Sequence, residues 1–237
     1  MNKEKKLGLV CLGVLLVFSI SLSLSPEVQA VGDNSVAVAV GSESSYVRYF
    51  DSSGNLINTL DNKDVPYVFE DNYIYTGNSS NSNVRKSDNN GNIIWTYDTG
   101  LQVRDVDVAY DNSVYVSDGT GGVMKLTSSG SEVWYKSRTG LETDTEDVSL
   151  NGSGDVYICG DDSAEGYLEL RRENDGAVIY SKTTSNDIFS ISYDKSNNYL
   201  YSLDAFGNLT KWTSDLSNQV WSKGVGLIGE FVVVGDY

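Results

Sequence analysis

Carboxylates are the side chains of this sequence with the clearest capacity for chemistry. Asp161, Asp162 and Glu165 lie in one short polar segment that ends at Gly166. Carboxylate oxygens are the hard ligands that calcium takes in proteins, so these three residues are a candidate calcium site. The segment lacks the alternating Asp-x-Asp-x-Asp-Gly order of a dedicated calcium loop. Calcium is therefore one ligand to test here, and no other metal or cofactor is expected.

A second pair of carboxylates lies at Asp105 and Asp107. Because strand side chains alternate with a period of two, these residues share one face of a predicted strand and could pair as general acid and base. No cofactor motif lies beside them in the sequence. We therefore expect them to face solvent or a channel.

The composition excludes several functions. The chain has no His, which rules out Ser-His-Asp and Cys-His nucleophile activation and His-ligated zinc within it. Its 33 acidic and 17 basic residues give a net charge of −16 over 237 residues. Nucleic-acid binding depends on clustered Lys and Arg, so we expect no nucleic-acid partner.

Residues 1–30 have the features of a secretory signal peptide. Lys3, Lys5 and Lys6 precede an apolar stretch from Leu7 to about Leu24, and the sequence Val28-Gln29-Ala30 matches a small-residue cleavage site. We expect a mature domain over residues 31–237 that is secreted or held at the cell surface. If the segment is retained instead, it would anchor the chain in a membrane.

The elements that must position these carboxylates belong to an internal repeat. Each repeat has a β-like run, a short polar turn and a second run that closes on an aromatic residue. The closing positions at 58, 95, 134, 180 and 221 lie 37 to 46 residues apart. Four of them are aromatic, namely Trp95, Trp134, Tyr180 and Trp221, whereas Asn58 breaks the rule.

Four short strands are predicted in each repeat. Apolar strands such as Tyr73-Ile74-Tyr75 and Val156-Tyr157-Ile158 precede the closing runs, and alternating runs such as Phe189 to Tyr193 precede those strands. No stretch of the mature chain has helical periodicity. β-Branched and aromatic residues between Gly, Asn, Asp and Ser turns favour antiparallel sheets. Four strands per forty-residue repeat are typical of a propeller blade.

The repeat resembles the PQQ-like, or quinoprotein-like, β-propeller family. The resemblance rests on the Gly-x-x-x-Trp spacing after a Leu-rich strand, on the dipeptides Thr99-Gly100 and Thr139-Gly140, and on the Val-Tyr-Val strand that follows. It implies that Trp95, Trp134, Tyr180 and Trp221 dock one blade against the next. The family includes quinone-dependent dehydrogenases and non-catalytic assembly scaffolds.

The predicted fold is thus an all-β propeller of four-stranded antiparallel blades. Residues 31–237 supply about five blades, whereas the family usually has seven or eight. The run Phe231 to Val234 duplicates a strand type already present. It either sits at the seam of a five-blade ring or begins an incomplete sixth blade.

Loops between the second and third strands would emerge on one face together with the loops that join blades. The first kind carries Asp118, Asp161, Asp162, Glu165 and Asp204. The second kind carries Asp98, Glu142, Asp144, Glu146, Asp147 and Asp187. Such a face would attract a cation or a basic protein patch. The alternative is a uniformly solvated acidic surface, as expected of a protein exposed to high salt.

Three functions follow from these observations. The first is a non-enzymatic binding or assembly scaffold, which we favour. The second is a quinoprotein oxidoreductase, against which stand the small number of blades and the lack of a quinone-binding motif, so we expect no PQQ. The third is a structural envelope or virion component of a halophile, supported by acidity and predicted export alone.

Overall fold

The computed structural model describes most of the chain beyond residue 27. The described residues are 28–31, 35–40, 46–50, 55–61, 64–69, 73–78, 81–88, 91–138, 143–162, 165–226 and 232. Residues 1–27, and with them most of the predicted signal peptide, lie outside this set. So does the predicted strand Phe231 to Val234, apart from Val232.

All the regular structure in the described residues is β-strand. The strands are β1 (Val28–Val31), β2 (Ser35–Val40), β3 (Tyr46–Phe50), β4 (Leu56–Asp61), β5 (Asp64–Phe69), β6 (Tyr73–Asn78), β7 (Asn83–Asp88), β8 (Ile93–Asp98), β9 (Val103–Val108), β10 (Val114–Asp118), β11 (Gly122–Leu126), β12 (Glu132–Ser137), β13 (Thr143–Leu150), β14 (Val156–Asp162), β15 (Glu165–Arg171), β16 (Val178–Thr184), β17 (Ile188–Asp194), β18 (Tyr199–Asp204), β19 (Asn208–Thr213) and β20 (Gln219–Gly224). A search of the same residues finds no helix long and apolar enough to cross a membrane. β1 extends across the predicted cleavage point after Ala30.

The strands form four-stranded antiparallel sheets, each built from four consecutive strands. The described residues form five such sheets, made of β1 to β4, β5 to β8, β9 to β12, β13 to β16 and β17 to β20. The prediction of an all-β chain with four-stranded antiparallel sheets is confirmed. Tight turns with a left-handed residue, such as Gly130 and Gly176, connect the third and fourth strands.

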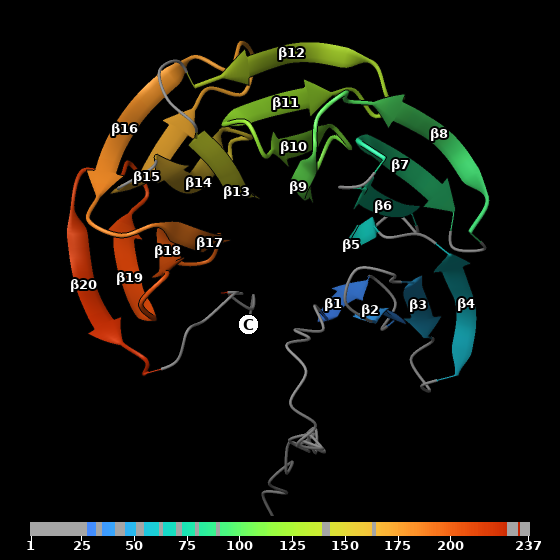
Figure 1. Ribbon diagram of the computed structural model, residues 1–237, viewed down its shortest axis with the longest axis horizontal. Coiled ribbons are helices and arrows are strands. Elements are labelled where there is room, and N and C mark those ends of the chain that lie inside the picture. Colours follow the sequence, from blue (N-terminus) through green and yellow to red (C-terminus); the bar gives the residue numbers. More distant parts are fainter. Residues whose placement is uncertain are drawn as a thin grey trace, which may run out of the picture.

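The sheets stand side by side along an arc, with β5, β9, β13 and β17 toward its centre and β8, β12, β16 and β20 on its outer side (Figure 1). Each inner strand lies against the first two strands of the preceding sheet, as β13 does against β9 and β10. The arc is open between β20 and β4 in Figure 1. Among the described strands, no pairing joins the first sheet to the last, so a closed ring is not seen.

The hydrophobic core lies between neighbouring sheets. Tyr157 and Leu168 of one sheet pack with Ile191, Leu200 and Trp212 of the next, and all five are buried. From the second sheet to the fifth, neighbouring sheets therefore bury apolar side chains against each other, so the repeat has to stack in order to bury its apolar surface.

Two of the closing aromatics form contacts across these junctions. The indole Nε1 of Trp95 donates a hydrogen bond to the Ser128 carbonyl at 3.1 Å, and that of Trp134 donates to the Glu173 carbonyl at 3.1 Å. Both acceptors lie in the turn between the third and fourth strands of the next sheet. Trp134 is buried, whereas Trp95 remains partly exposed.

The other closing positions show no such bond among the described contacts. Tyr180 is partly exposed and packs against the core shared by the last two sheets. Trp221 is also partly exposed and makes an edge contact with Tyr201 of its own sheet. The side chain of Asn58 lies outside the described residues.

Asp105 and Asp107 have a different place from the one expected. Asp105 Oδ2 accepts the backbone N–H of Val148, and Asp107 Oδ2 accepts that of Leu150, both at 3.0 Å. Asp105 is only 5% exposed. The two carboxylates thus join β9 to the inner strand of the next sheet. The expectation that they face solvent or a channel was wrong for Asp105, whereas Asp107 is partly exposed.

The next junction repeats this arrangement. The N–H of Ile191 donates to Asp147 Oδ2 at 2.7 Å, and that of Tyr193 donates to Ser149 Oγ at 3.1 Å. These bonds satisfy backbone groups on strands that have no ladder partner on that side. Polar side chains two residues apart therefore hold the inner strands of successive sheets together.

Candidate cation-binding site

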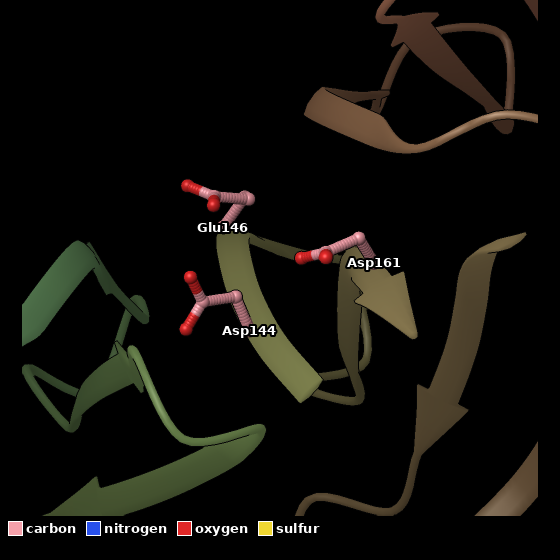
Figure 2. Close-up of side chains that lie close together, drawn as sticks. All are labelled: Asp144, Glu146 and Asp161. Atoms are coloured by element: carbon pink, nitrogen blue, oxygen red, sulfur yellow. The ribbon is translucent and has the colours of Figure 1, made fainter. Parts of the chain in front are cut away.

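Three carboxylates gather at one end of the sheet formed by β13 to β16. Asp144 and Glu146 come from the start of β13, and Asp161 comes from the end of β14 (Figure 2). One carboxylate oxygen of each lies within 4.8 Å of those of the other two. All three residues are partly exposed, so the cluster can be reached from solvent.

The strand register brings these residues together. Asp144 and Asp161 are direct partners in the antiparallel pairing of β13 and β14. The register shifts between Thr145 and Asp147, which leaves Glu146 as the extra residue of a β-bulge. Because a bulge redirects the side chain of its unpaired residue, Glu146 can join the cluster although it has no partner across the ladder.

One cation from the neighbouring sheet already contacts the cluster. The guanidinium Nη2 of Arg104, on β9, lies 2.5 Å from Asp144 Oδ2 and 3.9 Å from Glu146 Oε1. One Arg against three carboxylates leaves an excess of negative charge. The side chains of Arg104 and Asp144 are 30% and 29% exposed, so water screens this pair in part.

The electrostatics of the cluster reflect this excess. Burial raises the pKa of Glu146, an effect that Arg104 opposes and Asp144 and Asp161 reinforce. Burial also raises the pKa of Asp161, and the negative charges of Asp144 and Asp187 add to it. Both shifts mean that the carboxylates resist ionising side by side. A bound cation would relieve that repulsion.

The other members of the predicted calcium segment lie apart from this cluster. Asp162 Oδ2 is 3.3 Å from the Arg138 guanidinium. Glu165 is exposed and pairs with Asp162 across β14 and β15. Neighbouring residues of a strand point to opposite faces, so Asp161 and Asp162 lie on different faces of β14. The structure thus brings Asp161 together with Asp144 and Glu146.

Two further residues of the predicted acidic face have structural roles. Asp118 is 4% exposed, and its Oδ1 accepts hydrogen bonds from Thr120 N, Thr120 Oγ1 and Gly122 N. Asp204 is 7% exposed and accepts bonds from Asn186, Phe206 and Asn208. Each carboxylate holds the turn after the second strand of its sheet.

The pKa of Asp204 is consistent with this role. Burial alone would raise it, but the hydrogen bonds from Asn208, Asn186 and Phe206 outweigh burial and lower the pKa. The carboxylate is therefore ionised and already surrounded by donors. Asp118 Oδ1 and both oxygens of Asp204 thus accept hydrogen bonds from the protein itself.

Sequence reasoning placed Asp144 and Glu146 on the same predicted face as Asp161 but did not assign the three residues to one site. Asp144 and Glu146 lie 15 to 17 positions before Asp161 and belong to the segment that joins two repeats. The sequence did indicate that Asp144 and Glu146 could share a site, because residues two apart on a strand point to the same face. Their pairing with Asp161 depends on the register of β13 against β14.

No protein-family model matches the chain, and no curated protein sequence matches it.

Proposed function

We propose that the stacked sheets are blades of a β-propeller-like repeat of the PQQ-like kind, and that the protein is a non-enzymatic binding or assembly scaffold at the cell surface or outside the cell. The repeat of four antiparallel strands and the Trp contacts between sheets support the first part. The pattern of residues 1–30 supports export. We transfer no catalytic residue and no quinone from the family.

The observation that carries the binding function is the Asp144, Glu146 and Asp161 cluster. Three carboxylates from two strands converge, and Arg104 is the cation in contact with them. A partner that brings positive charge would gain attraction without having to assemble the site, because paired strands already hold two of the three residues in place. The partner is a divalent cation such as calcium, or a basic patch of another protein.

Thermal unfolding in calcium tests the first kind of partner. Wild type is melted in about 10 mM calcium chloride and in sodium chloride of the same ionic strength. A site with a Kd near 1 mM, in the range of extracellular calcium modules, would add about 1.4 kcal/mol. That stabilisation corresponds to a rise of about 3–6 °C for a domain of this size.

Variants that remove negative charge test whether calcium binds at this cluster. The double variant Asp144→Asn, Asp161→Asn should lose the calcium-specific rise, because it removes two of the three charges. Asp175→Asn is the matched control, since its side chain is 51% exposed, forms an ion pair with Arg172 and accepts the N–H of Ala177 in its own turn. It should retain the full difference between calcium and sodium.

A basic partner is tested with immobilised protein and a Lys-rich peptide. Retention should weaken in the double variant, remain in Asp175→Asn, and decline as salt rises, because surface electrostatics are screened. Equal stabilisation by calcium and sodium, together with no difference in peptide retention between wild type and the double variant, would show that the cluster is a solvated acidic surface.

A further inference from the structure

A second surface feature lies at the opposite ends of the same strands. Two hollows of about 420 and 450 Å³ open there, one between the β9 to β12 and β13 to β16 sheets and the other between the β13 to β16 and β17 to β20 sheets. They share the turn Asn151-Gly152-Ser153 as a common wall. The two hollows are therefore adjacent, and together they are called the groove below.

This groove is separate from the acidic cluster. β13 runs from the cluster at Asp144 to the groove at Leu150. Six residues of extended strand span about 20 Å. A ligand in one site would not touch the other, so the groove and the acidic cluster are independent sites.

The shared wall is a rigid turn. Asn151 Oδ1 accepts hydrogen bonds from Ser153 N, Ser153 Oγ and Asp155 N, at 2.8 to 2.9 Å. Gly154 supplies the left-handed residue with a φ of 91°. Gly152 faces open space, since an added Cβ would meet nothing within 4 Å. A ligand would meet a preformed wall and would not have to order a loop.

The lining combines a buried apolar floor with an exposed aromatic ring. Val108, Leu150 and Leu170 are 5 to 7% exposed and contribute little apolar surface to solvent. Tyr110, in contrast, is 92% exposed at the edge of the first hollow. In the second hollow, Tyr193 is partly exposed and stacks on Tyr157 with ring centroids 5.4 Å apart.

The charged side chains of the groove are already engaged by the protein. Asp111 accepts from Ser113 N and Ser113 Oγ at 2.9 Å. Glu173 pairs with Lys125. Asp215 Oδ1 accepts bonds from its own turn, and those hydrogen bonds lower the pKa of Asp215 to about 2.

Lys195 brings a positive charge to the same lining and interacts with Asp107. Both signs of charge are thus present, and the carboxylates have partners within the protein. The groove suits an uncharged ligand that forms hydrogen bonds better than it suits an ion.

We propose that this groove binds a neutral oligosaccharide, with a sugar ring stacked on Tyr110 and hydroxyl groups bonded to the polar side chains of the turns. A sugar has an apolar ring face that an aromatic side chain can cover and a polar edge that amide, hydroxyl and ammonium groups can satisfy. An extended peptide fits less well, because the apolar floor residues are buried and leave little exposed apolar surface for its side chains.

Calorimetric titration of the full chain with cellohexaose, maltohexaose and chitohexaose tests the proposal. We expect wild type to bind at least one of the three. Tyr110→Ala should weaken that binding about tenfold through loss of the stacked ring, and Tyr110→Phe should restore most of it. Tyr110 is almost wholly exposed, so both variants should fold.

Phe206→Ala is the matched control. Phe206 is a 74% exposed aromatic in the turn between β18 and β19, at the other ends of the strands. Its replacement should leave saccharide binding unchanged. The proposal is overturned if none of the three oligosaccharides binds, if Tyr110→Ala binds as well as wild type, or if Phe206→Ala weakens binding equally. It is also overturned if an uncharged peptide, and no sugar, binds in a manner that depends on Tyr110.

Discussion

The indole of Trp134 spans the junction between two sheets and donates its N–H to the backbone carbonyl of Glu173 at 3.1 Å. Trp134 is 7% exposed and lies on an outer strand, where neighbouring side chains such as Val133 are exposed. The ring therefore buries apolar area and satisfies a turn carbonyl of the next sheet in one contact. Trp95 makes the same kind of bond to Ser128, so this contact accounts for the aromatic residue at two of the closing positions.

Trp134→Ala should destabilise the protein strongly. Removal of a buried Trp costs roughly 3–5 kcal/mol through lost burial and the cavity left behind. Lys136→Ala, on the same strand but exposed, should change stability by less than about 0.5 kcal/mol. Urea unfolding of the two variants measures the difference. Equal losses would contradict the docking role.

Gly176→Ala should weaken the same junction from its other side. Gly176 has a φ of 65°, and an added Cβ would lie 2.9 Å from Trp134 Cε3 and 2.7 Å from Lys136 Cγ. We expect a cost of about 1–3 kcal/mol from the left-handed backbone, and more from the contact with the ring. Gly152→Ala, where a Cβ meets nothing within 4 Å, should cost clearly less. The midpoints of thermal unfolding compare the two, and a larger loss for Gly152→Ala would refute this packing.

Stability should depend on pH through Asp107. Burial raises the pKa of Asp107 to about 6, although the N–H bonds from Val108 and Leu150 and the charge of Lys195 work against that rise. The native state then binds more protons than the unfolded state between about pH 4 and pH 6. This contribution to stability therefore falls as the pH rises through that window, by about 3 kcal/mol at most.

Asp107→Asn is the variant that checks this effect. The amide cannot ionise, so the difference in unfolding free energy between wild type and variant should change steadily from pH 4 to pH 6.5. Urea unfolding at several pH values supplies the curve. Asp175→Asn, with its 51% exposed side chain, should track wild type across the range. A constant difference for Asp107→Asn would show that Asp107 titrates normally.

Cys159 should react with thiol reagents only when the protein unfolds. It is 0% exposed, and burial together with the charges of Asp147, Glu146 and Asp105 raises its pKa well above the usual range. A thiol that is buried and protonated is inert. Labelling of the Cys11→Ser chain, in which Cys159 is the one thiol, with an aromatic disulfide reagent should follow the urea unfolding curve. Rapid labelling of the native protein would contradict the burial of β14.

Much of the strand pattern could be predicted from the sequence. Apolar runs such as Val156-Tyr157-Ile158, set between Gly, Asn and Asp turns, indicated strands, and β14 begins at Val156. The alternation with a period of two and the lack of helical periodicity already defined an all-β chain. The recurring Trp indicated a contact between repeats, because an aromatic residue that recurs at the same position of successive repeats is expected to pack between them.

The composition of the candidate site depended on the tertiary structure. Asp161 meets Asp144 and Glu146 because β13 and β14 pair in one register and a bulge adds one residue. A shift of one residue would have turned every side chain to the other face, and no local pattern sets that choice. The roles of Asp118 and Asp204 were equally hidden, because a carboxylate that holds a turn and one that faces solvent have the same neighbours in sequence. Local patterning determined which segments are strands, whereas long-range pairing decided which carboxylates share a surface.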